Sequence, residues 1–151
     1  MPDAPPPARD AALLALRPRL TDADGRPLTA APDTPEAFQN EVLRPILKLQ
    51  HPLLLATWHR YAERQKGRYH KLNRPEREAY LRHALQTNRE LRSFLLGLVC
   101  AVMTEGEWGA FRQNERELSR RALALATDRL NDGLHAGQPT NDYESGTGQE
   151  R

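Results

Sequence analysis

Histidine and cysteine are among the residue types in this chain that could hold a metal ion or act as nucleophiles. A helical metal centre pairs Glu-x-x-His motifs on two helices, and no glutamate stands three residues before any histidine. A single cysteine excludes an intramolecular disulfide and a metal site built from cysteines. We therefore expect no metal ligand and no cofactor. The residues concerned are His51, His59, His70, His83, His135 and Cys100.

The motifs of nucleophilic and nucleotide-dependent catalysis are missing from the sequence. There is no G-x-S-x-G turn, no Walker loop and no G-x-G-x-x-G segment. Cys100 lies inside an apolar run and has Glu105 downstream, and both features raise the pKa of a thiol. Pairs of glutamates fall in the expected first turns of helices, where capping explains them. We assign no catalytic residue, and the sequence favours a protein that is not an enzyme.

Polar residues are interleaved with apolar ones where the first helix of the body is expected. Glu41, Arg44 and Lys48 are three and four positions apart, so they share a helix face. Pro45 lacks an N–H group and leaves the carbonyl of Glu41 without its helical donor. Two interpretations stay open. The set is either an ion-pair network that holds a kinked helix or a pocket for a small anionic ligand, lined by Gln39, Glu41, Arg44 and Lys48.

Positive charge is concentrated between residues 60 and 92. This stretch carries ten basic and four acidic residues, although the whole chain, with 22 basic and 20 acidic residues, has a net charge of only +2. Tyr61 and Tyr69 lie among the first cations, as a surface that follows a phosphate backbone would require. The stretch is either a solvated basic face or a site for nucleic acid or another polyanion, with Arg60, Arg64, Arg68 and Lys71 as candidates.

The elements that position these residues are predicted to be helices. Residues 34–132 read as an all-α domain, a compact bundle of about five helices, and the rarity of β-branched residues argues against a sheet. Thr34, Asn73 and Thr104 are expected N-caps. Pro45 and Pro52 predict kinks in the first helix. The apolar face of that helix is expected at Phe38, Val42, Ile46, Leu49 and Leu53.

A second apolar stretch, residues 94–103, is the longest uncharged one in the chain. It is about half of the roughly 20 residues that a membrane-spanning helix needs, so it predicts a buried core helix and no membrane partner. Phe94 is expected inside this core.

The two ends of the chain differ from the body in composition. Residues 1–33 form a proline-rich arm, expected to be flexible, in which Asp10 caps a short helix that docks on the body and Pro18 ends it. Residues 133–151 are polar and are expected to be a disordered tail. The N-terminus has no basic and apolar signal pattern, so we expect a cytoplasmic protein.

The segment 38–50 reads F-Q-N-E-V-L-R-P-I-L-K-L-Q. It resembles the opening motif F-Q-N-E-x-L-R-P-[IV]-x-K-L-Q of a group of short all-helical bacterial proteins without established activity, some of which carry the label "glyoxalase". The resemblance covers roughly residues 8–131 and implies a helical domain. Glyoxalases of the common fold hold their metal with His and Glu on strands, and this sequence predicts neither strands nor such ligands.

The supply of apolar residues exceeds what about 100 ordered residues would bury. Small bundles commonly bury such an excess in a two-fold interface. The sequence therefore favours a non-enzymatic protein-interaction module, a homodimer with a further protein partner that it does not identify. Nucleic-acid binding by the basic stretch and a small-anion pocket at Pro45 are the alternatives.

Overall fold

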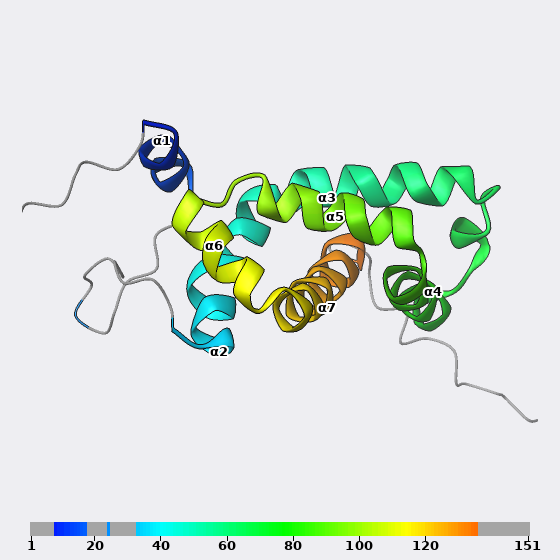
Figure 1. Cartoon of the computed structure of the whole chain (residues 1–151). Helices are drawn as coiled ribbons and strands as arrows, with labels where there is room; N and C mark the ends of the chain where they lie inside the picture. The colour runs from blue at the N-terminus through cyan, green and yellow to red at the C-terminus, as the bar shows by residue number, and fades with distance from the viewer. Residues whose placement is uncertain (1–7, 18–23, 25–32, 136–151) are drawn as a thin grey trace, which may run out of the picture.

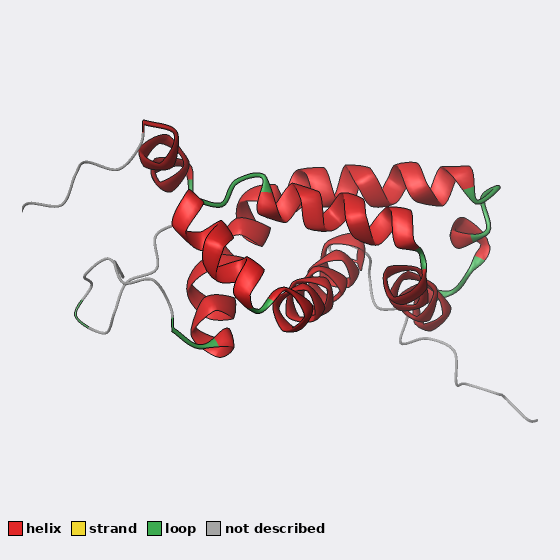
Figure 2. Ribbon diagram, viewed as in Figure 1, coloured by secondary structure: helices red, strands yellow, loops and turns green. Residues whose placement is uncertain are grey.

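The computed structural model describes residues 8–17, 24 and 33–135 of the chain, and its regular elements there are all helical (Figures 1 and 2). This confirms the predicted all-α fold. Besides the α-helices there are one π-helical turn, η1, and one 3₁₀ turn, η2. In chain order the elements are α1 (Ala8–Leu16), α2 (Pro35–Phe38), η1 (Gln39–Leu43), α3 (Arg44–Arg64), η2 (Tyr69–Lys71), α4 (Arg74–Thr87), α5 (Arg89–Cys100), α6 (Glu105–Gln113) and α7 (Glu115–His135).

The helices begin where the sequence places caps. The side chains of Thr34 and Asn73 accept hydrogen bonds from the backbone N–H groups three residues on. Thr104 forms a complete capping box, because Glu107 N–H donates to Thr104 Oγ1 while Glu107 Oε1 accepts from Thr104 N–H at 2.9 Å. Each cap satisfies a backbone donor that the first helical turn leaves unpaired.

A wide turn precedes Pro45. The N–H group of Arg44 donates to the carbonyl of Gln39, five residues back, which is the π-helical pattern. A proline ring clashes with the carbonyl four residues before it in a regular α-helix, and the wider coil relieves that crowding. Helix α3 then continues through Pro52. The coil that carries α2 and η1 runs in a different direction from the long part of α3, so the predicted kinked first helix is confirmed (Figure 1).

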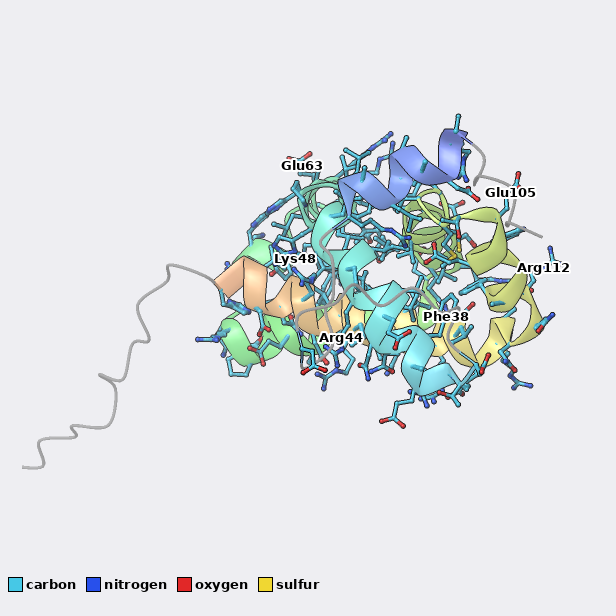
Figure 3. All side chains as sticks on the ribbon, turned by 90° about the vertical axis from the view of Figure 1, so that its left-hand side faces the viewer. Phe38, Arg44, Lys48, Glu63, Glu105 and Arg112 are labelled. Carbon is cyan, nitrogen blue, oxygen red and sulfur yellow. The ribbon has the colours of Figure 1, made fainter. Side chains whose placement is uncertain are left out.

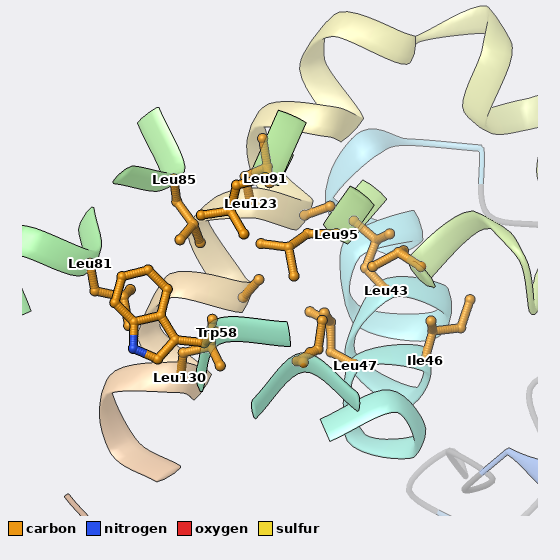
Figure 4. Packing of buried hydrophobic residues seen from close by; sticks show 14 of the residues in the cluster. Leu43, Ile46, Leu47, Trp58, Leu81, Leu85, Leu91, Leu95, Leu123 and Leu130 are labelled. Carbon is orange, nitrogen blue, oxygen red and sulfur yellow. The ribbon is translucent and has the colours of Figure 1, made fainter. Parts of the chain in front are cut away.

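The core lies where α3, α4 and α5 pack around α7. Trp58 is fully buried, as are Leu81 and Leu130 (Figure 4). Leu54 is also fully buried. The Trp58 indole ring meets Tyr69 edge-on, with ring centroids 5.3 Å apart. The 22 buried apolar side chains of the described residues form one continuous cluster. A single interior therefore holds the body together.

The last helix is longer than the sequence indicated. We predicted that the tail would begin at residue 133, but α7 continues to His135, which is buried. A Cβ atom on Gly133 would lie 2.8 Å from His51 Cε1, so Gly133 sits close against α3. This packing supports a glycine within the helix, and local composition alone does not reveal it. The rest of the predicted tail, residues 136–151, lies outside the described part of the chain.

Helix α1 docks on the corner between α5 and α6. It begins at Ala8, so Asp10 lies inside its first turn and is not the cap that the sequence indicated. Arg9 donates to the carbonyls of Met103 and Ala101, and the Glu105 N–H donates to the Asp10 carboxylate. Most of this helix's apolar surface, in contrast, is exposed: Leu14 is 46% and Leu16 66% exposed. The helix is therefore held mainly by charged groups. The remainder of the predicted arm, residues 1–7, 18–23 and 25–32, lies outside the described residues.

Candidate functional site

The four polar residues predicted to line a pocket at Pro45 are not joined to one another. Gln39 accepts a hydrogen bond at 2.8 Å from Arg121 of α7, and Arg44 Nε donates to Asn40 at 3.1 Å. Arg44 and Lys48 are exposed (Figure 3). Glu41 is partly buried. The π turn adds a residue before Pro45, so Glu41 does not keep the α-helical phase with Arg44 and Lys48 that the prediction assumed.

Residues 38–50, which resemble the opening motif of the helical bacterial proteins, make contacts that hold the fold together. Phe38, Leu43 and Ile46 enter the core, and Gln39 links the start of the body to α7. Gln50 is buried and donates from Nε2 to the carbonyl of Leu98 at 2.8 Å. Two glutamines of this segment therefore fasten the kinked helix to two others.

The four cations predicted to bind nucleic acid, Arg60, Arg64, Arg68 and Lys71, are all exposed. They lie at the end of α3, in the following loop and in η2. No ion pair joins any of the four to another residue of the described chain. Arg77, by contrast, is engaged, because it donates to the carbonyls of Tyr69 and His70 and covers the Tyr69 ring.

The cysteine and histidine side chains, which could act in catalysis or bind a metal ion, do not form a cluster in the described part of the chain. Burial raises the pKa of the Cys100 thiol to about 11, and the charge of Glu115 adds to the increase. The thiol is therefore protonated at neutral pH and a poor nucleophile. Burial lowers the pKa of His51, and nearby Arg129 acts in the same direction. Within residues 8–17, 24 and 33–135, no three His, Cys, Asp or Glu side chains are placed to hold a metal ion.

The clearest unexplained surface is the outer side of α3 and α5. These helices lie side by side and run in opposite directions (Figure 1). The Gln50–Leu98 hydrogen bond fixes their register. Leu53 is three residues after Gln50 and Phe94 is four residues before Leu98, so these two side chains stand at the same level. Leu53 is 51% and Phe94 55% exposed.

Four exposed residues near Leu53 and Phe94 on these two helices are small or cyclic, and the exposed Glu90, one turn before Phe94, borders them. We call the whole set the α3–α5 face. A Cβ atom built on Gly97 would meet no atom within 4 Å, so the surface is open at this point. Because the side chains beside the apolar centre are short, another helix can approach closely. The α3–α5 face consists of Pro52, Leu53, Ala56, Phe94, Gly97 and Ala101.

This face corrects two predictions about the core. Leu53 was expected on the buried face of the first helix, but that stripe runs through Gln50, Leu54 and Trp58. A hydrophobic pattern cannot place a glutamine inside, because only the Leu98 carbonyl makes its burial favourable. Phe94 was expected inside the core because residues 94–103 are apolar throughout. Helix α5 buries one stripe, Leu91, Leu95 and Val99, and leaves Phe94 outside.

Comparison of the chain with models of known protein families, with curated proteins and with solved structures gives no match. Function is therefore inferred from the chemistry of the residues. Among the described helices, none is both long and apolar enough to cross a membrane.

Proposed function

We propose that this chain is a cytoplasmic, non-enzymatic interaction module that forms a homodimer through its α3–α5 face. The observation that carries the proposal is the half-exposed pair of Leu53 and Phe94 at one level of two neighbouring helices. Exposed apolar side chains that adjoin one another mark contact sites more often than isolated ones do. A second copy presents the same pair, so a two-fold axis across the face brings the two pairs together.

The chemistry of the face favours contact with a protein. None of its six residues is charged, and its centre holds a leucine and a phenylalanine. Aromatic side chains and a core depleted in charge are typical of the centres of protein interfaces. The face is made of two helices, so a second copy packs helix against helix, as the rest of this fold does. A face of six residues is small for a protein interface, so we expect a weak, concentration-dependent dimer.

The experiment measures mass by light scattering or sedimentation over a wide range of protein concentration. The mass of the native chain should rise from 17.2 kDa towards twice that value. Phe94→Glu and Leu53→Glu each place a carboxylate at the centre of the interface and should hold the protein at 17.2 kDa. Circular dichroism should stay helical, because neither side chain belongs to the core.

Matched controls place the same charge on exposed apolar residues elsewhere. Trp108→Glu on α6 and Leu16→Glu on α1 should leave the dimer intact, although Trp108 is 42% and Leu16 66% exposed. A native chain that stays monomeric at every concentration refutes the homodimer. A dimer that is lost with Trp108→Glu or Leu16→Glu and kept with Phe94→Glu assigns the interface to another surface.

Polyanion binding is a second candidate function, supported by the exposed and unpaired state of Arg60, Arg64, Arg68 and Lys71. Affinity for a mixed-sequence oligonucleotide should fall steeply between about 50 and 200 mM salt. Replacement of all four cations by glutamine should abolish binding at low salt. Failure of the native chain to bind at low salt rejects this candidate and leaves the dimer proposal unaffected.

A further inference from the structure

A hollow of about 500 Å³ lies between α4, α5 and α7, away from the α3–α5 face and from the predicted pocket at Pro45. Its volume falls in the range of about 300–1,000 Å³ that small-molecule sites occupy. Leu85, Leu123 and Ala124 supply its apolar lining. Thr127 also lines it, but its hydroxyl already donates to the Leu123 carbonyl. The interior of the hollow therefore offers apolar surface.

Three arginines contribute to the lining of this hollow, one from each helix: Arg82 of α4, Arg92 of α5 and Arg120 of α7. Asp128 is the one acidic residue among the described residues that line the hollow, so the lining carries a net charge of +2. Guanidinium groups bind carboxylate, sulfonate and phosphate groups through paired hydrogen bonds.

The fold itself leaves donors of these arginines unused. Arg82 makes no hydrogen bond or ion pair with any residue of the described segments, and the glutamate four residues before it, Glu78, pairs with Arg74. Arg92 spends Nη1 on the carbonyl of Gln86 at 2.7 Å, which leaves Nε and Nη2. Arg82 is exposed and pairs with no residue of the described chain, so its guanidinium group is free to bind a ligand.

The positive charge of Arg120 is only partly balanced by its ion pair. Its carboxylate, Glu117, is bound at the same time by Arg121, with both nearest N–O distances at 2.8 Å. Hydrogen bonds from Arg120 and Arg121 lower the pKa of Glu117, so this carboxylate is ionised at neutral pH. One negative charge therefore faces two guanidinium groups, and a surplus of positive charge remains beside the hollow.

We propose that this hollow binds a small amphipathic anion, an aryl or alkyl group that carries a carboxylate or phosphate. The apolar group contacts Leu85, Leu123 and Ala124, and the acidic group pairs with Arg82 and Arg92. An anion without an apolar group would leave the side chains of Leu85, Leu123 and Ala124 in contact with water. The site is independent of the proposed dimer, because no residue of the α3–α5 face lines it.

The test titrates the full chain with phenyl phosphate, benzoate and uncharged benzyl alcohol, using calorimetry and amide chemical shifts. One or both anions should shift the amides of residues 82–86 and 123–128, and the one that binds more tightly identifies the acidic group. Benzyl alcohol should bind at least 10-fold more weakly. Inorganic phosphate should also bind at least 10-fold more weakly than phenyl phosphate, because it lacks the apolar body.

The variant Arg82→Gln with Arg92→Gln should weaken anion binding at least 10-fold. Lys66→Gln with Arg112→Gln removes the same charge from the surface outside the hollow and should change affinity less than twofold. Equal weakening by both double variants overturns the site, because it shows non-specific attraction. Shifts outside the hollow, absence of binding by both anions, or equal binding of inorganic phosphate also overturn it.

Discussion

The ion pair between Arg17 and Glu107 holds α1 on the body, and its removal is expected to release this helix. The Arg17 side chain is 6% exposed and that of Glu107 15% exposed, and Arg17 Nη2 lies 2.9 Å from Glu107 Oε1. Both Nη atoms also donate to Oε2 at 3.1 Å. Loss of one partner from a buried pair costs about 3–5 kcal/mol, because the other charge stays buried without compensation.

The cost is expected to appear locally. Helix α1 has nine residues, and its exposed leucines add little apolar burial. Detachment of α1 returns the uncompensated charge to water without opening the core. Arg17→Met should therefore reduce the hydrogen-exchange protection of the amides of residues 12–16. About 3 kcal/mol corresponds to a roughly 150-fold loss, limited by the exchange rate of an undocked helix.

Glu107→Gln separates the ion pair from the capping box. Glutamine also serves as the third residue of a capping box, so the bond to the Thr104 N–H should survive and α6 should keep its protection. Only α1 should lose protection. Arg112→Met is the matched control, because its pair with Glu115 is exposed at both ends and 3.6 Å long, and such pairs contribute about 0–1 kcal/mol.

The outcome that refutes this reasoning is specific. If α1 in Arg17→Met exchanges as slowly as α1 in Arg112→Met, the ion pair does not hold the helix. If Glu107→Gln exposes the amides of α6 together with those of α1, the cap and the ion pair are one unit.

Three further predictions concern the core, the glycines and the thiol. Trp58→Ala should lower the free energy of unfolding by about 3–5 kcal/mol in urea titrations, since the indole is fully buried. A loss below 1 kcal/mol would contradict this packing. Gly109→Ala should raise the free energy of unfolding by about 0.5–1 kcal/mol, because a Cβ atom there meets nothing within 4 Å. Gly133→Ala should give no such gain, because its Cβ atom would crowd His51. Equal gains of the two variants in thermal melts would be inconsistent with that contact. With the pKa of Cys100 raised from 9.0 to about 11, the thiolate fraction at pH 8 is about 100-fold lower. Alkylation of Cys100 in the native chain should therefore be far slower than in urea and should accelerate as pH rises towards 11. Equal alkylation rates in the native and unfolded states would refute the shift.

Local signals in the sequence were sufficient for much of the fold. Caps depend on neighbours three residues apart, so Thr34, Asn73 and Thr104 could be recognised without any tertiary information. The helical class followed from the period of the apolar residues and from the scarcity of β-branched ones. A short helix was also expected in the N-terminal arm, but Asp10, expected to cap it, lies inside its first turn and accepts a hydrogen bond from the Glu105 N–H.

Features that depend on long-range partners could not be predicted. The burial of Gln50 requires a carbonyl 48 residues away, and that bond decides which side of α3 turns inward. Phe94 and Leu53 were therefore assigned to the wrong surface. The hollow brings together arginines from three helices, and only the packing of α4, α5 and α7 makes them neighbours. The sequence located part of the positive charge and gave no indication of the concavity.

The π turn amounts to one surplus residue inserted into an otherwise continuous helix. We expect Pro45 and this surplus residue to be coupled, because the wider coil makes room for the proline ring beside the preceding turn. Deletion of Asn40 alone should force the ring against the preceding turn, whereas the same deletion combined with Pro45→Ala should restore a regular helix with both flanks in phase. Thermal melts of the single and double changes would measure this coupling. In evolutionary terms, the two features are expected to be gained or lost together.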